Sequence, residues 1–186
     1  EDLDSSLGNY GYYHYDSAGR KHGLYRLYYD PEMTKPKYAW AYYENKIHGI
    51  ATAWYENGTI GERIEYQYGM QHGLTKTWWE NGNRLYEGNF DNEARIGTHT
   101  YWYENGYKRE ETVYLNDLKN GSYAYWYENG TLQESGTYSN DQKTGVWTQW
   151  HDNGVKKAEG NYSNNQKTGT WTYWYSDGSL SRSENY

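Results

Sequence analysis

Glycine recurs at a fixed interval of 24 residues along most of this 186-residue chain. Self-similarity at such a period is the signature of a repeat architecture, in which each unit packs on its neighbours. We number each repeat from its glycine, which is position 1. The series consists of Gly49, Gly73, Gly97, Gly121, Gly145 and Gly169, and Gly23 precedes it by 26 residues.

Large aromatic side chains occupy two fixed places in the repeat, positions 6 and 18. Aromatic rings bury large areas, so we expect both sets to be structural. At position 6 stand Tyr28, Trp54, Trp78, Trp102, Trp126, Trp150 and Trp174. At position 18 stand Tyr66, Phe90, Tyr114, Tyr138 and Tyr162.

Two kinds of turn divide each repeat into two strands. The triplet E-N-G, as at 56–58 and 128–130, predicts a hairpin with a type I′ turn, because Asn-Gly tolerates positive φ at both central residues. The other turn, as in S-N-D-Q-K-T-G at 139–145, is longer and polar and ends on glycine. Near the N-terminus, D-P-E-M-T-K-P-K at 30–37 predicts a loop in place of the first tight turn.

The residues between the turns are Thr, Tyr and Trp alternating with polar groups, which favours strands, and no helical periodicity is present. The sequence therefore predicts an all-β fold: a β-hairpin repeat solenoid that forms one elongated, twisted antiparallel sheet of about 14 strands. We expect the array to span residues 10–186 and residues 1–9 to form an N-terminal arm.

Alternation along the strands predicts which side chains share a face. We place position 6 with positions 16 and 18, so that the small residues at position 16, such as Gly136 and Gly160, let the position-6 indole lie flat. Rings at positions 3, 5 and 7 then form a band on the opposite face. Exposed apolar bands mark interaction surfaces. The candidate interaction surface comprises Tyr101, Tyr125, Trp147, Trp171 and Tyr173.

Composition restricts the partners and the chemistry. The chain has 26 Tyr and only one Phe, which suits a thin sheet whose ring hydroxyls reach water. The net charge of -7 is spread evenly without a basic patch, so we expect neither nucleic acid nor an anionic membrane as partner. The first residue is Glu1, not Met, which fits either a removed signal peptide or a boundary chosen for expression. The former favours a secreted or cell-surface protein.

Candidate catalytic and metal-binding groups have simpler interpretations. His22, His48 and His72 precede repeat glycines, but equivalent positions lie about 9.6 Å apart, too far for shared coordination. Acidic residues at the E-N-G turns form a row along one rim, and we interpret them as solvated turn residues. Catalytic carboxylates need a raised pKa, and exposed turn residues lack the burial that would raise it. Without a catalytic triad order, phosphate loop or cysteine, we expect no enzyme activity, metal or cofactor. The acidic row consists of Glu56, Glu80, Glu104, Glu128 and Asp152.

The pattern G-x-x-x-x-W-Y-E-N-G, followed by a strand, an aromatic and a polar turn, resembles the bacterial variant of the MORN repeat seen in YwqK-family antitoxins. The resemblance covers residues 10–186. It implies hairpin repeats in an elongated, twisted sheet. Because members of that family bind proteins and include some that neutralise a secreted toxin, the resemblance also implies protein binding. Eukaryotic relatives are linked to membrane contacts and scaffolding. The repeat has no catalytic residues, so the resemblance assigns none.

Three functions of different classes stay open. The first is a non-catalytic protein-interaction module, in its sharpest form an immunity or antitoxin-like binder of a secreted protein. The second is a self-assembling extracellular or cell-surface fibre subunit, joined head to tail by strand pairing at open sheet edges. The third is binding of carbohydrate or cell wall along the aromatic band. The open edge strand is expected to include Ser179, Leu180, Ser181, Arg182 and Tyr186.

Overall fold

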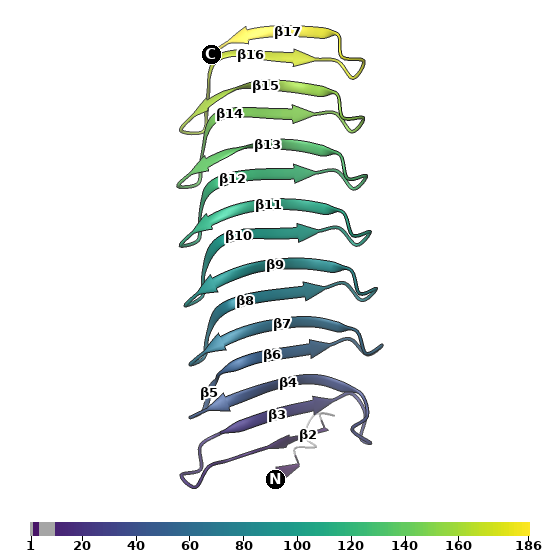
Figure 1. Cartoon of the computed structure of the whole chain (residues 1–186), viewed down its shortest axis with the longest axis vertical. Coiled ribbons are helices and arrows are strands. Elements are labelled where there is room, and N and C mark those ends of the chain that lie inside the picture. The colour runs from purple at the N-terminus through teal and green to yellow at the C-terminus, as the bar shows by residue number, and fades with distance from the viewer. Residues whose placement is uncertain (1, 4–9) are drawn as a thin grey trace. The chain divides into compact units, whose positions relative to one another are not determined.

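The computed structural model describes residues 2–3 and 10–186, and every regular element among them is a β-strand. The chain forms two compact units, Glu1–Ala94 and Arg95–Tyr186. Within each unit the strands pair antiparallel with neighbours along the chain (Figure 1). The predicted all-β class and the 24-residue hairpin repeat are confirmed.

The first unit is a meander in which successive hairpins pair edge to edge. A short strand, β5, interrupts the pairing, so that β4 contacts both β5 and β6. The strands are β1 (Asp2–Leu3), β2 (Tyr10–Tyr13), β3 (Gly23–Tyr28), β4 (Pro36–Tyr43), β5 (Lys46–Ile47), β6 (Gly49–Trp54), β7 (Ile60–Gln67), β8 (Met70–Trp78) and β9 (Arg84–Asp91).

The second unit is more regular. Its repeats have the same register, with position 1 opposite position 18, as in the pairs Gly121 with Tyr138 and Gly145 with Tyr162. The strands are β10 (Ala94–Trp102), β11 (Lys108–Leu115), β12 (Leu118–Trp126), β13 (Leu132–Ser139), β14 (Gln142–Trp150), β15 (Lys156–Ser163), β16 (Gln166–Trp174) and β17 (Leu180–Asn185).

The predicted N-terminal arm, residues 1–9, lies outside the described residues except for β1. There, Asp2 pairs with Tyr13 and Leu3 with Tyr12, so this dipeptide adds a short strand to β2. The predicted loop near the N-terminus is present. Tyr29 N donates to Lys35 O at 2.9 Å across it, and β4 then starts at Pro36, a position where the missing N–H is tolerated.

The type I′ turns occur in the polar segments and not at E-N-G, so the prediction for the turns was wrong. Ser139 pairs directly with Gln142, which leaves a two-residue loop of Asn140 and Asp141. Their φ values of 47° and 64° are both positive, as a type I′ turn requires. Asn and Asp tolerate this conformation better than other non-glycine residues, which explains why the segment is polar.

The E-N-G segments form a different hairpin loop. In the loop after β12 only Gly130 has positive φ, at 84°, and its N–H donates to Tyr127 O at 2.9 Å. Asn129 Oδ1 accepts from Thr131 N at 2.9 Å. The strand register shifts between Tyr125 and Trp126. This is a type I turn followed by a left-handed glycine bulge, so Asn-Gly supplies one left-handed residue here and not two.

That bulge changes which side chains share a face. Trp147 at position 3 lies opposite Gly160 at position 16, so positions 3, 16 and 18 share a face. Position 6 lies beyond the register shift, where Trp150 pairs with Lys156. The prediction that position 6 shares a face with positions 16 and 18 is therefore wrong, because an added residue reverses the alternation.

Candidate binding surface

Two of the rings predicted to form an exposed band, Trp147 and Trp171, form the core of the second unit. Trp147 and Trp171 have exposed fractions of 0% and 1%, and Ala158 is equally buried beside them. The partly buried rings of Tyr123, Tyr138, Tyr162 and Tyr173 pack against them. Tyr101 and Tyr125 are half-buried, and burial raises the pKa of Tyr101. Trp147 and Trp171 are thus core residues, which corrects the predicted interaction surface at these two positions, whereas Tyr101, Tyr125 and Tyr173 remain partly exposed.

Glycine at position 16 makes this burial feasible. A Cβ built on Gly160 would lie 2.4 Å from Trp171, and one on Gly136 only 2.2 Å from Trp147. Each indole therefore lies on a glycine of the preceding repeat. Its Nε1 donates to a backbone carbonyl, from Trp171 to Asn161 O at 3.0 Å. The predicted role of a small residue beside a flat indole is correct, but the indole is at position 3.

Lysine side chains cover the same face. Lys143 Nζ lies 3.8 Å from the Trp147 ring centroid, and Lys167 Nζ lies 4.4 Å from that of Trp171. Cation–π contacts of this kind stabilise by about 0.5–2 kcal/mol, more where water is excluded. The two indoles are covered on both sides and therefore present no exposed ring face to a ligand.

The position-6 residues hold consecutive repeats together through their carbonyl oxygens. The position-7 tyrosine of one repeat donates its hydroxyl to the position-6 carbonyl of the next. Tyr55 donates to Trp78 O at 2.8 Å, and Tyr127 donates to Trp150 O at 2.9 Å. The position-6 rings themselves are half-buried. The ladder therefore uses the backbone at position 6, not the rings.

The acidic row at the E-N-G turns takes part in a second ladder. Asn129 Nδ2 donates to Asp152 O at 2.9 Å, and Asn57 Nδ2 to Glu80 O at 3.1 Å. The backbone carbonyls of the acidic residues are the acceptors. Their carboxylates are exposed, in accordance with the interpretation as solvated turn residues.

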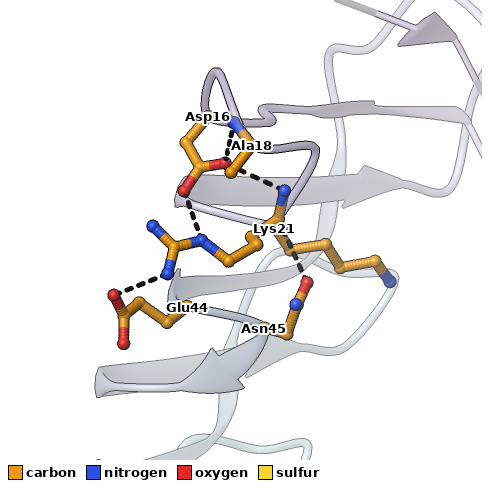
Figure 2. Close-up of polar contacts among 6 residues, drawn as sticks. Asp16, Ala18, Lys21, Glu44 and Asn45 are labelled. Carbon is orange, nitrogen blue, oxygen red and sulfur yellow. Dashed lines mark hydrogen bonds and ion pairs between the residues drawn. The ribbon is translucent and has the colours of Figure 1, made fainter.

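The opposite rim has a corresponding ladder built from Asp and Asn side chains. In Figure 2, Asn45 Oδ1 accepts from Lys21 N of the preceding turn at 2.7 Å, whereas Asp16 Oδ1 accepts from Ala18 N within its own turn at 2.9 Å. The Arg20 guanidinium bridges Asp16 and Glu44, at 2.8 Å to each. A backbone N–H of one turn therefore finds its acceptor in a side chain of the next turn.

A group of exposed rings on this rim was missed by the sequence reasoning. We call it the rim aromatic cluster, and it belongs to the first unit. Its rings meet at centroid distances of 5.0 Å for His48 with Tyr68, 6.1 Å for Tyr43 with Tyr68 and 5.4 Å for His22 with Tyr43. Tyr43 is 43% exposed and Tyr68 is 50% exposed. The cluster comprises His22, Tyr43, His48 and Tyr68.

Tyr68 occupies a turn position at which the following repeats have Asn. Position 20 is Asn92, Asn116, Asn140 and Asn164 in the following repeats, with φ between 47° and 50°. Tyr68 has the same left-handed φ of 50°. A bulky residue is disfavoured there. Tyrosine in place of asparagine at position 20 was the signal in the sequence that could have revealed the cluster.

The histidines predicted as turn residues lie in two different environments. His22 and His48 contact Tyr43 in the cluster, while His72 Nδ1 lies 3.2 Å from Asp91. Within residues 2–3 and 10–186, no group of three His, Cys, Asp or Glu side chains is arranged to hold a metal ion. Nor does that part of the chain contain a helix long and apolar enough to cross a membrane.

The predicted edge strand is β17. It pairs with β16, with Arg182 opposite Tyr173, and no second partner strand is paired with it among the described residues of this unit. Arg182 Nε lies 2.7 Å from Glu184 Oε1, so the strand carries an exposed ion pair. Leu180 is 62% exposed and Tyr186 is 54% exposed, whereas Ser181 is partly buried and Ser179 lies in the turn before β17.

Comparison with known proteins agrees with this architecture. The MORN repeat variant profile matches residues 47–68, 71–92, 119–140, 143–164 and 167–186. No curated protein matches the chain. The hairpin of β10 and β11 is not matched, yet Gly97 pairs with Tyr114 in the register of the other repeats. It differs in its core, where His99 and Thr112 are buried at positions 3 and 16. Since the matched segments cover more than half of its residues, the chain belongs to the MORN repeat variant family.

Proposed function

We propose that this protein is a non-catalytic protein-interaction module and that the rim aromatic cluster contacts the partner. The observation that supports this most is Tyr68. Its left-handed backbone is unfavourable by about 1–3 kcal/mol for such a residue, and half of the ring remains in water, so burial does not offset the strain. Local violations of turn chemistry of this kind concentrate at functional sites.

The chemistry of the cluster fits a protein surface. Tyr is enriched in interface cores and hot spots, where rigid rings give large contact areas. Tyr43 and Tyr68 are 43% and 50% exposed and their ring centroids lie 6.1 Å apart, so the two rings present one aromatic surface on the rim. The net charge of -7 favours a basic partner through electrostatic steering. An immunity or antitoxin-like complex with a basic secreted protein is the sharpest form of the proposal.

The test is binding of secreted proteins from the source cells, followed by affinity measurement on the purified partner. Tyr68→Asn is expected to weaken binding by about tenfold or more, the loss typical of an interface hot spot. Tyr107→Thr is the matched control, because Tyr107 is 54% exposed in a turn of the second unit outside the cluster. A partner bound equally by wild type and Tyr68→Asn would refute the role of the cluster.

Self-association through β17 is the second candidate. It is favoured by the side of β17 that pairs with no strand among the described residues of its unit, since open edges invite pairing with another chain. Arg182 and Glu184 weigh against it, because charges on an edge strand oppose such pairing. Light scattering and electron microscopy at high protein concentration test it. Filaments abolished by Ser181→Pro would support assembly, and a strict monomer would remove it.

A further inference from the structure

Two cavities occupy the same place in the repeat, one in each unit. The cavity of the second unit has a volume of about 290 Å³ and is lined by Tyr125, Tyr127, Glu134, Gln149, Trp150 and Lys157. The cavity of the first unit has a volume of about 360 Å³ and is lined by Tyr29, Tyr38, Trp54, Tyr55, Glu62 and Trp78. In both, the carboxylate comes from position 14.

In the second unit this carboxylate has internal partners. Lys143 Nζ lies 3.2 Å from Glu134 Oε1, and Gln149 Nε2 donates to the same oxygen at 2.9 Å. The repeat before it has a similar arrangement, with Lys119 Nζ 3.6 Å from Glu110 Oε1. In both cases the lysine at position 23 neutralises the glutamate at position 14 within the sheet.

The first unit has the carboxylate without these partners. At position 23 its repeat has Gln71, whose Nε2 donates to Thr75 Oγ1 at 2.6 Å. Thr77 and Leu85 stand where the other cavity has Gln149 and Lys157. Among the described residues, no Lys, Arg or His lies within ion-pair distance, 4.0 Å, of Glu62. Burial raises the pKa of Glu62, and no neighbouring charge counteracts it.

The walls of this cavity are aromatic. The Tyr29 and Tyr55 hydroxyls donate to Trp54 O and Trp78 O, each at 2.8 Å, so their polar groups are already used. The rings can hold a cation, since Lys37 Nζ lies 5.3 Å from the Tyr29 ring centroid and 5.8 Å from that of Tyr38. That ammonium group is outside ion-pair distance of Glu62. Aromatic rings around a carboxylate suit an organic cation, which combines ion pairing with cation–π contact.

We infer that the cavity around Glu62 binds an alkylammonium group, supplied either by a lysine side chain or by a free amine. The external ammonium takes the place that Lys143 occupies beside Glu134. This inference does not depend on the rim aromatic cluster, so Tyr68→Asn is expected to leave ammonium binding unchanged.

The test is titration of the full chain with three probes at low ionic strength, followed by tryptophan fluorescence and calorimetry. The probes are N-acetyl-lysine methylamide, butylammonium and the uncharged analogue 1-butanol. Both cations are expected to bind and 1-butanol to bind at least about tenfold more weakly, because it lacks the charge. Tighter binding of the lysine derivative identifies a peptide source, and equal binding identifies a free amine.

Three variants locate the site. Glu62→Gln removes the charge and Gln71→Lys supplies the missing internal cation, so each is expected to weaken ammonium binding by about tenfold or more. Glu134→Gln is the matched control in the self-neutralised cavity and should change affinity by less than about twofold. The inference is overturned if the wild type binds neither cation, if Glu62→Gln or Gln71→Lys binds like the wild type, or if Glu134→Gln loses binding equally.

Discussion

A single missing methyl group at Gly160 determines whether the core indole of the last repeats can pack. A Cβ there would lie 2.4 Å from Trp171, in contact with a ring that has no space to move. Gly160→Ala is therefore expected to lower the free energy of unfolding by about 1–3 kcal/mol, the range for overpacking. Urea unfolding followed by tryptophan fluorescence measures it. Asn161→Ala, at the adjacent exposed position, should stay within about 0.5 kcal/mol, and an equal loss in both variants would contradict the packing argument.

Glu62 should destabilise the fold when it is ionised. Burial raises its pKa in the folded state, so the unfolded chain releases this proton more readily. The penalty is absent at pH values below about 4, where both states are protonated, and grows as pH rises through the folded pKa. Glu62→Gln is thus expected to raise the free energy of unfolding at pH 7 and to change nothing at low pH. Denaturant unfolding across a pH series measures this.

The matched carboxylate at Glu134 is expected to behave in the opposite sense. It accepts hydrogen bonds from Lys143 and Gln149, and Glu134→Gln would leave the lysine without its counter-ion, so this variant should lower stability at pH 7. If Glu62→Gln also lowered stability at neutral pH, Glu62 would have a stabilising partner. That result would also weaken the inferred ammonium site.

At the scale of the strand and turn, the position-7 hydroxyl connects one hairpin to the next. Tyr127→Phe removes the donor to Trp150 O and is expected to cost about 0.5–1.5 kcal/mol of unfolding free energy. Tyr175 holds the same position in the repeat that starts at Gly169 and is 58% exposed, and among the described residues its hydroxyl donates to no position-6 carbonyl. Tyr175→Phe should therefore have an effect below about 0.5 kcal/mol. Thermal unfolding of both variants decides the point, and equal effects would exclude the ladder as their cause.

The turn at Tyr68 offers the converse case, a change that should stabilise. Asn has the side chain used at position 20 in the following repeats and tolerates the φ of 50° better than tyrosine. Tyr68→Asn is expected to raise the free energy of unfolding by up to about 1 kcal/mol, since the ring is half exposed and its loss removes little burial. Chemical unfolding tests this expectation. A large destabilisation would mean that the ring is structural.

At the scale of the whole molecule, the 26 tyrosines make stability sensitive to alkali. Burial raises the pKa of Tyr138 to about 12, with Glu134 and Glu110 adding to the effect, and burial also raises the pKa of Tyr123. In the unfolded chain these hydroxyls ionise near pH 10. The unfolded state therefore loses protons first, and stability is expected to fall as the pH rises from about 10 to about 12.

Absorbance of tyrosinate, recorded together with circular dichroism, measures this dependence. Some of the hydroxyls should ionise only in step with the loss of β-structure. Ionisation of every tyrosine near pH 10 with the strand signal intact would show that the rings are not buried as described.

The sequence by itself determined the repeat, the strand positions and the approximate turn positions, because these follow from local backbone preferences. Glycine every 24 residues and polar Asn-containing segments are recognisable without tertiary contacts. It also indicated that a small residue lies beside an indole, but it assigned that indole to position 6 and not to position 3. Two departures from the repeat were also visible in the sequence: Tyr68 stands where other repeats have Asn, and Gln71 stands where they have Lys119 and Lys143. The sequence did not show what these departures do.

Only the tertiary structure decided which face is buried. The bulge between Gln149 and Trp150 shifts the register by one residue and so moves position 6 away from the core face, which exchanges the predicted surface for the core. The difference between Glu134, which pairs with Lys143, and Glu62 likewise depends on distances between side chains that are nine or more residues apart. Such distances arise when strands pair, and local sequence preferences do not encode them.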